Sequence, residues 1–205
     1  MAKKLMLNAP CVDVDLPRIG GEALIGGVVE WPAAPDGKAL TLLISVPTTF
    51  LNDNVGFKLP VGMFVSVFSY YDAQEYFLDY VTYHGSSQEL ALLREGYTRV
   101  ILHQSGFEVA GVPSVPAMAM QAEGEVADDE PYTGSKLGGK AGLLQAEPLG
   151  LNDECFALQI YGARFPHPFR GVLGLSDAVG YLFIRPKASP GDLGKDAGTF
   201  FVQTT

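Results

Sequence analysis

The fold is decided by the stretch Arg18-Ile19-Gly20-Gly21-Glu22-Ala23 and by its later counterpart Lys136-Leu137-Gly138-Gly139-Lys140-Ala141. In both stretches a basic residue and an apolar residue precede a Gly-Gly pair. Glycine is needed where the backbone adopts a positive φ, or where another segment comes too close to leave room for a side chain. Two such turns in the same local context indicate an internal repeat.

The spacing downstream of the two turns supports the same interpretation. Pro32 lies 12 residues before Ile44 in one strand-like run, and Pro148 lies 12 residues before Ile160 in another. The sequence therefore predicts two similar sheet-containing units, related by a pseudo-twofold axis, within a single domain of residues 1–205. The two predicted units are residues 16–68 and 135–202.

Short apolar runs, 24 glycines and 14 prolines favour a strand-dominated α+β fold over a doubly wound one. Alternation along the central strands predicts which side chains face the core. The predicted core residues are Trp31, Leu42, Ile44, Phe64, Val65, Phe156, Leu158, Ile160, Leu182 and Ile184.

The segment between the two units, residues 70–133, differs from them and is predicted to be an acidic insert. Ser86-Ser87-Gln88-Glu89 is typical of a helix start and Gly96 can end that helix, so we predict one short helix. Residues 98–109 predict a hairpin with its turn at Ser105-Gly106. Prolines and a run of acids predict that residues 111–132 form an exposed loop.

Three acids near the start of this insert are interleaved with four tyrosines. Asp72, Glu75 and Asp79 are three and four positions apart, so a helix would place them on one face. Acids beside tyrosines are typical of a protein-recognition surface, because tyrosine gives a large contact area at low entropic cost. The alternative is a solvated helix face whose aromatic rings point into the core. The predicted partner-binding residues are Asp72, Glu75, Asp79, Glu123, Glu125, Asp128, Asp129 and Glu130.

The chain has 205 residues, with 23 acids against 14 bases and a net charge of -9. This charge opposes binding to nucleic acid, whose affinity comes from neutralising phosphates with Lys and Arg, and favours a basic protein as the partner. No apolar run is long enough for a signal peptide or a membrane span. Two cysteines are too few for a disulfide framework, so we expect a cytoplasmic protein with reduced, partly buried thiols.

The sequence contains no convincing catalytic constellation. Residues 134–140 have the glycine and lysine spacing of a phosphate-binding loop, but Ala141 stands where a hydroxyl should reach magnesium. The histidines His84, His103 and His167 are scattered, without the spacing of metal ligands, and no nucleophile elbow surrounds a serine. We therefore expect no enzyme activity, no metal and no cofactor.

Four features carry a resemblance to a known family: the paired Gly-Gly turns, Trp31-Pro32 after the first turn, Leu59-Pro60 before Gly62-Met63-Phe64, and Leu158-Gln159-Ile160 in the second half. In these features the sequence resembles the YwqG-like family of bacterial proteins. The resemblance covers residues 16–68 and 135–202. It implies a cytoplasmic α+β protein with an internal duplication, no established activity or cofactor, and no catalytic residues; some members of the family accompany toxins as immunity proteins. After Ile160 an aspartate-rich stretch is replaced by residues 164–168, which argues against an ion-binding role there.

Three classes of function fit these observations: an immunity protein, a binder of small molecules or carbohydrates that uses Trp31 and the glycine turns, and an enzyme with an unrecognised site. The first accounts best for the acidity and the missing catalytic motifs. A toxin that acts on nucleic acid has a basic groove, which carboxylates can fill in place of phosphates. We therefore expect the protein to bind and occlude a basic, nuclease-type toxin domain from a bacterial secretion or polymorphic toxin system.

Overall fold

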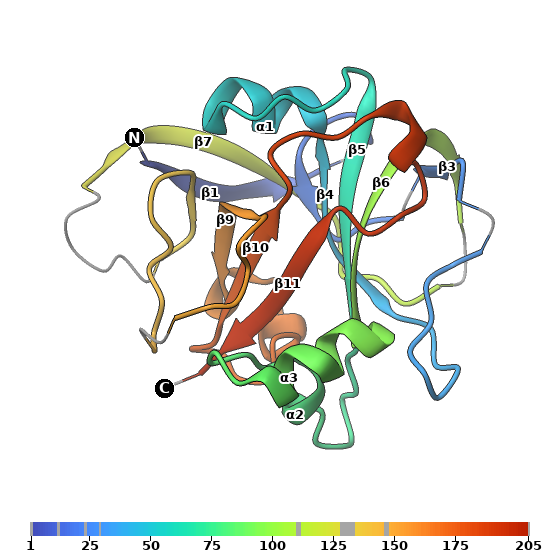
Figure 1. Ribbon diagram of the computed structural model, residues 1–205, viewed down its shortest axis with the longest axis vertical. Coiled ribbons are helices and arrows are strands. Elements are labelled where there is room, and N and C mark those ends of the chain that lie inside the picture. The colour runs from blue at the N-terminus through green and yellow to red at the C-terminus, as the bar shows by residue number, and fades with distance from the viewer. Residues whose placement is uncertain are drawn as a thin grey trace.

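The computed structural model of the protein describes most of the chain. Figure 1 shows α1 (Thr48–Val55) at one end of the molecule, and α2 (Leu78–Val81) with α3 (Ser87–Leu92) at the other. A π-type turn, Leu93–Tyr97, continues α3, and 3-10 turns span Gly162–Arg164, Phe169–Gly171 and Pro190–Asp192. The described residues are 2–11, 13–22, 24–28, 30–109, 112–127, 134–145 and 148–204.

Within these ranges, eleven strands form one sheet in the order β11-β10-β9-β8-β1-β7-β2-β4-β5-β6-β3. All the pairings between the named strands are antiparallel, so the fold is strand-dominated as predicted. The strands are β1 (Ala2–Pro10), β2 (Arg18–Ile19), β3 (Leu24–Gly26), β4 (Thr41–Pro47), β5 (Met63–Ser69), β6 (Thr98–Glu108), β7 (Met118–Val126), β8 (Lys136–Leu137), β9 (Cys155–Tyr161), β10 (Val179–Ile184) and β11 (Gly198–Gln203).

The strand order reads alike on the two sides of the central β1–β7 pair. On one side β2 joins β7 to β4, and on the other side β8 joins β1 to β9. Further out, β4 pairs with β5 and β5 with β6, while β9 pairs with β10 and β10 with β11. The strand β3 adds to the first side only, at the far end of β6.

The two Gly-Gly turns have similar backbone geometry. The φ angles are 57° and 80° in Gly20-Gly21, and 69° and 71° in Gly138-Gly139. The first N–H of each pair donates to a neighbouring strand at 2.8 Å, to the carbonyl of Leu43 in one turn and of Ala157 in the other. A Cβ on the first glycine of the first pair would lie 2.1 Å from the carbonyl oxygen of Val115, so this approach requires glycine.

Two rows of buried polar side chains cross the sheet at corresponding register positions, one on each side of the central pair. A buried polar group is costly unless it is hydrogen-bonded. In the second row, Gln159 accepts the N–H of Gly142 at 2.8 Å, and the Tyr181 hydroxyl donates to the carbonyl of the same glycine at 2.8 Å. This row therefore fixes an adjoining turn. The first row is Arg18, Ser45 and Ser66, and the matching second row is Lys136, Gln159 and Tyr181.

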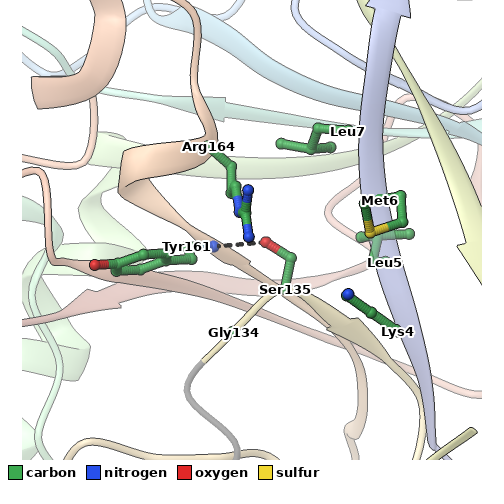
Figure 2. A pocket seen from close by; sticks show the side chains of 8 residues that line it. All are labelled: Lys4, Leu5, Met6, Leu7, Gly134, Ser135, Tyr161 and Arg164. Carbon is green, nitrogen blue, oxygen red and sulfur yellow. Dashed lines mark hydrogen bonds between the residues drawn. The ribbon is translucent and has the colours of Figure 1, made fainter.

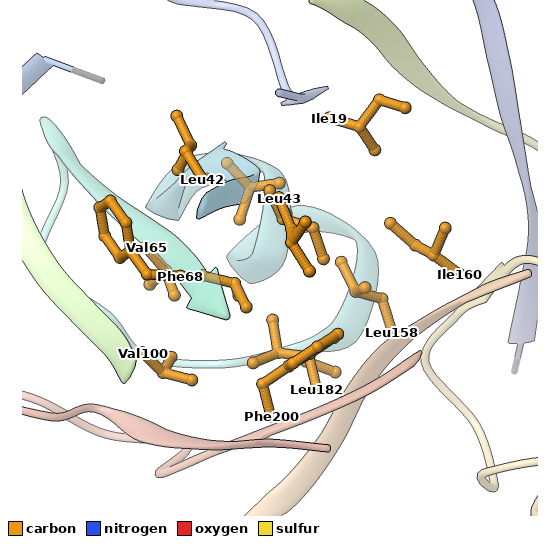
Figure 3. Packing of buried hydrophobic residues seen from close by; sticks show 14 of the residues in the cluster. Ile19, Leu42, Leu43, Val65, Phe68, Val100, Leu158, Ile160, Leu182 and Phe200 are labelled. Atoms are coloured by element: carbon orange, nitrogen blue, oxygen red, sulfur yellow. The ribbon is translucent and has the colours of Figure 1, made fainter. Parts of the chain in front are cut away.

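Apolar side chains from both sides of the central strand pair meet in a large hydrophobic cluster, part of which Figure 3 shows, and a second cluster includes Phe156 and Tyr181. Nine of the ten predicted core residues are buried, and Ile44 and Ile160 are each only 1% exposed. Trp31 is the exception. It is partly buried, it meets Phe68 edge-on with ring centroids 5.1 Å apart, and its indole N–H donates to the carbonyl of Leu40 at 2.8 Å.

The sheet curls until the chain ahead of β11 reaches β6. Gly194 donates its N–H to the carbonyl of Leu102 at 2.8 Å, and Ala197 donates to Val100 at 2.6 Å. The hydroxyl of Thr98 donates to a carbonyl within β11 at 2.9 Å. Because the two sides of the sheet meet in this way, the first part of β6, residues 98–102, has neighbours on both edges.

The predicted helix is confirmed as α3. Ser86 is its N-cap, with an Oγ that accepts the N–H of Gln88 at 3.2 Å, and Gly96 beyond its end has φ of 113°. The expectation of a single helix is wrong, because α1 and α2 are also present. Helix α1 is rich in Thr, Asn and Asp, which form helices weakly, so its stability depends on tertiary contacts. Its Asn52 side chain bonds both the N–H and the carbonyl of Leu59 at 2.9 Å.

The predicted hairpin is wrong, because β6 runs without a turn from Thr98 to Glu108. The backbone of β3 approaches this part of β6 so closely that a Cβ on Gly106 would lie 2.5 Å from the nitrogen of Gly26. Glycine within a strand often marks such a close approach of backbones. Here it permits strand packing and not a turn.

The prediction that residues 111–132 form an exposed loop is wrong for β7. The register with β1 places Glu123 opposite Lys4 and Glu125 opposite Lys3. Opposite charges that face each other on neighbouring strands contribute about 0.2–1 kcal/mol per pair, so these acids favour strand pairing. The middle segment 70–133 thus supplies β6 and β7 to the sheet.

Among the residues described, no helix is long and apolar enough to cross a membrane. Both cysteines are free thiols. Cys11 is partly buried as predicted, whereas Cys155 is exposed at the start of β9, contrary to the prediction.

Candidate functional site

The predicted partner-binding acids lie in two separate places. Asp72, Glu75 and Asp79 lie in the loop after β5 and in α2, at one end of the molecule in Figure 1. Glu123 and Glu125 lie on β7, which is well separated from α2 in the same view. The structure therefore does not bring the two groups together. The remaining predicted acids, Asp128, Asp129 and Glu130, lie outside the described residues.

Asp72 organises a turn, and α2 begins only at Leu78, so no helix spans the three acids. The Asp72 carboxylate accepts the N–H of Gln74 at 2.8 Å and that of Glu75 at 3.2 Å, a local arrangement that competes with helix formation. It also forms an ion pair with Lys38. The hydrogen bond from Lys38 is the main cause that lowers the pKa of Asp72 to about 2, so this carboxylate is ionised but already paired.

The tyrosines of this region divide into buried and exposed side chains. Tyr80 stacks on Tyr97 with ring centroids 4.4 Å apart, and Tyr70 meets both rings edge-on. Burial raises the pKa of the Tyr70 hydroxyl, and its hydrogen bond to Asp36, 3.2 Å long, raises it further. Tyr76, in contrast, is 70% exposed. The aromatic rings therefore do not all point into the core.

Exposed apolar and acidic side chains gather around Tyr76. Leu175, from a distant loop, is 44% exposed, and Glu75 and Asp79 are exposed acids. We call this surface the Tyr76 patch. It adjoins a hollow of about 300 Å³ between residues 71–78 and the 171–175 loop. The Tyr76 patch consists of Glu75, Tyr76, Asp79 and Leu175.

Gly174 sets the distance between the two walls of this hollow. Its φ is 95°, and a Cβ there would lie 2.1 Å from Cδ2 of Leu78. Only glycine combines this backbone conformation with so close an approach. The loop that carries Leu175 can therefore lie directly against the start of α2.

A second hollow, of about 500 Å³, shares Tyr76 and Leu78 with the first and also contains His84 and Glu89. The Glu89 carboxylate accepts the backbone N–H of His84 at 2.8 Å and contacts Nδ1 of its ring at 3.1 Å. Burial raises the pKa of Glu89, but the hydrogen bonds from His84 outweigh it, so the pKa is lowered. The pair fixes the loop that enters α3.

Several residues around the Tyr76 patch were not predicted. Leu175 and Lys38 come from segments remote in sequence, so no local signal points to them. The contact between His84 and Glu89 had a signal, because Ser86 and Glu89 have the spacing of a helix cap in which the acid turns back to the preceding backbone. In the described part of the chain, no three His, Cys, Asp or Glu side chains are grouped to hold a metal ion.

Comparison with known proteins adds no relative: no family model matches the chain, and no curated protein matches it significantly. The class to which the chain can be assigned is therefore structural, a strand-dominated protein built on a curled antiparallel sheet.

Proposed function

We propose that the protein is an immunity protein that binds a basic, nuclease-type toxin domain through the Tyr76 patch. One observation carries the proposal: Tyr76 projects with 70% of its surface exposed, between two exposed acids and beside an apolar hollow. Tyrosine is enriched among the residues that dominate binding energy at protein interfaces. A partner side chain can enter the hollow while basic groups around it meet Glu75 and Asp79.

The charges favour this surface over the other predicted acids. Asp72 is paired with Lys38, and the two β7 acids each face a lysine across the strand pair, so their fields are partly cancelled. Glu75 and Asp79 form no ion pair with any residue that the structure describes. The chain as a whole carries a charge of -9, which accelerates encounter with a basic protein at low salt.

We also infer that the sheet arose by duplication of a five-stranded unit. The support is the matching strand order about β1 and β7, the similar glycine turns and the matched polar rows. On this division the units are β7-β2-β4-β5-β6 and β1-β8-β9-β10-β11, larger than residues 16–68 and 135–202. The insert then shrinks to the connection between β5 and β6, residues 70–97, which carries most of the Tyr76 patch. The resemblance to the YwqG-like family agrees with both inferences.

The alternative of a ligand site at Trp31 has less support, because that ring packs against Phe68 and its N–H is already bonded to the backbone. An interface formed by β7 acids alone also has less support, since β7 lacks exposed aromatic side chains along its described length. The Tyr76 patch thus combines apolar contact area with exposed acids that form no ion pair among the described residues.

The test first looks for a gene encoding a basic toxin domain beside the gene for this protein, and then assays that domain as a nuclease. The protein should inhibit cleavage, and Tyr76→Ala should weaken binding at least about tenfold, as truncation of a central interface tyrosine does. The double variant Glu75→Gln and Asp79→Asn should slow association, whereas Glu123→Gln with Glu125→Gln removes the same charge from β7 and should leave affinity within about twofold.

Two results would overturn the proposal. One is equal affinity of the Tyr76→Ala variant and the unaltered protein for a toxin domain that the protein does inhibit, which would remove the Tyr76 patch from the interface. The other is the absence of any neighbouring toxin gene together with failure to purify a basic partner in stoichiometric amount, which would remove the immunity function.

A further inference from the structure

A basic pocket lies where β1, the start of β8 and the turn after β9 meet. Its volume is about 260 Å³. Lys4 enters it from β1, and Arg164 enters it from the end of the 3-10 turn that follows β9. Figure 2 shows both cationic groups directed toward the hydroxyl of Ser135, which lies just ahead of β8. We call this hollow the Arg164 pocket.

The Arg164 pocket concentrates positive charge in an acidic protein. Neither Lys4 nor Arg164 forms an ion pair with any residue in the described ranges. Glu123 faces Lys4 from β7 and partly offsets its charge, but it does not line the pocket. Like charges around a partly enclosed hollow repel, and an anion between them relieves that repulsion.

The hydrogen-bonding groups fit a phosphate better than a carboxylate. The Ser135 Oγ accepts the N–H of Tyr161 at 3.0 Å, which leaves its own hydrogen to donate. Arg164 can donate two parallel hydrogen bonds, and Lys4 supplies a compact second charge. Together they match a group with three acceptor oxygens and a charge near -2, as a phosphomonoester has at neutral pH. A carboxylate offers one charge and two oxygens.

Met6 and Leu7 add apolar side chains to the wall of the pocket. They can cover a small organic group attached to the phosphate. Sites for drug-sized ligands occupy about 300–1,000 Å³, so this pocket suits a smaller molecule. No helix begins directly after β8 at residues 138–145, so the loop of residues 134–140 lacks the helix N-terminus on which a triphosphate cradle depends.

From these groups we propose that the Arg164 pocket binds a small phosphomonoester, held by Lys4, Arg164 and Ser135. The Arg164 pocket and the Tyr76 patch share no residue, so either proposal can fail alone.

Isothermal titration of the full chain with phenyl phosphate tests the site. Binding should be measurable in the millimolar range or tighter and should weaken as salt rises. Lys4→Gln and Arg164→Gln, both at exposed positions, should each weaken it about tenfold or more, because each removes a charged hydrogen-bond donor. Lys187→Gln removes an equal charge from an exposed position outside the pocket and should change affinity less than about twofold.

Two further ligands define the chemistry. Benzoate carries the same ring on a carboxylate and should bind more weakly than phenyl phosphate, and inorganic phosphate, which lacks the ring, should also bind more weakly. No heat with phenyl phosphate, or equal loss in the Lys187→Gln variant, would overturn the site. Equal affinity for benzoate would refute the preference for a phosphate over a carboxylate. Equal affinity for inorganic phosphate would refute the preference for an ester.

Discussion

The close approach at the first glycine turn makes Gly20→Ala a sharp test of the fold. The backbone has φ of 57° there, and the added Cβ would lie 2.1 Å from the carbonyl oxygen of Val115. That carbonyl accepts the N–H of Gly21 at 2.6 Å, so moving it breaks a hydrogen bond. The left-handed conformation costs about 1–2 kcal/mol, and the lost bond about 1–3 kcal/mol. The smaller conformational entropy of the unfolded variant offsets about 0.4–1 kcal/mol of this, so the expected net loss is about 1–4.5 kcal/mol.

Gly37→Ala is the matched control. Gly37 also has a positive φ, 84°, but nothing lies within 4 Å of an added Cβ. Only the conformational cost and the entropic gain remain, so the expected loss is about 0–1.5 kcal/mol. Urea unfolding at neutral pH measures both values, with an unchanged m-value as evidence that the unfolding reaction is the same. Equal losses in the two variants would refute the reasoning, because the contact with Val115 would then contribute nothing.

Ile44→Ala and Ile160→Ala should each lower the free energy of unfolding by about 2–5 kcal/mol, since both side chains are only 1% exposed; near-neutral shifts in urea midpoint would contradict their place in the core. Asp72→Asn should lower the melting temperature above pH 4 but not near pH 2, because the pKa of Asp72 is depressed to about 2 by Lys38 and its stabilising contribution is lost as the pH falls through that value. Glu89→Gln should also lower the melting temperature at neutral pH, and this effect should fade on acidification, because the folded-state pKa of Glu89 is lowered as well. A decrease in melting temperature that grows on acidification would contradict this expectation.

Local signals in the sequence predicted the parts of the fold that local interactions determine. Ser86 caps α3 because its hydroxyl satisfies a free N–H within two residues, and Gly20 occupies a backbone conformation that other residues disfavour. Alternating apolar residues located nine of the ten core positions, since side chains on a strand face alternate sides. Trp31 is less buried than predicted because its indole N–H must find a partner, here the carbonyl of Leu40.

Contacts between remote segments were not predictable in this way. β1 lies beside β7, so Lys4 meets Glu123 although well over a hundred residues separate them in the sequence. A run of acids without bases resembles a solvated loop until its partner strand is known. Lys38 neutralises Asp72 for the same reason, across 34 positions. The sequence therefore had no means to separate the acids near α2 from those on β7.

Under the proposed duplication, the two surfaces proposed for binding lie where the two sides of the sheet differ. The strands on both sides must keep their register, so their polar and charged side chains face one another or support turns, as Glu125 does with Lys3 and Gln159 does with Gly142. Connections between strands are free of that constraint. The connection from β5 to β6, residues 70–97, is longer than its counterpart from β10 to β11, and its additional chain carries the exposed Tyr76. The turn after β9 replaces the helix α1 found after β4, and the Arg164 pocket lies beside it. Binding surfaces are thus expected where the two sides differ, and both proposed sites meet that expectation.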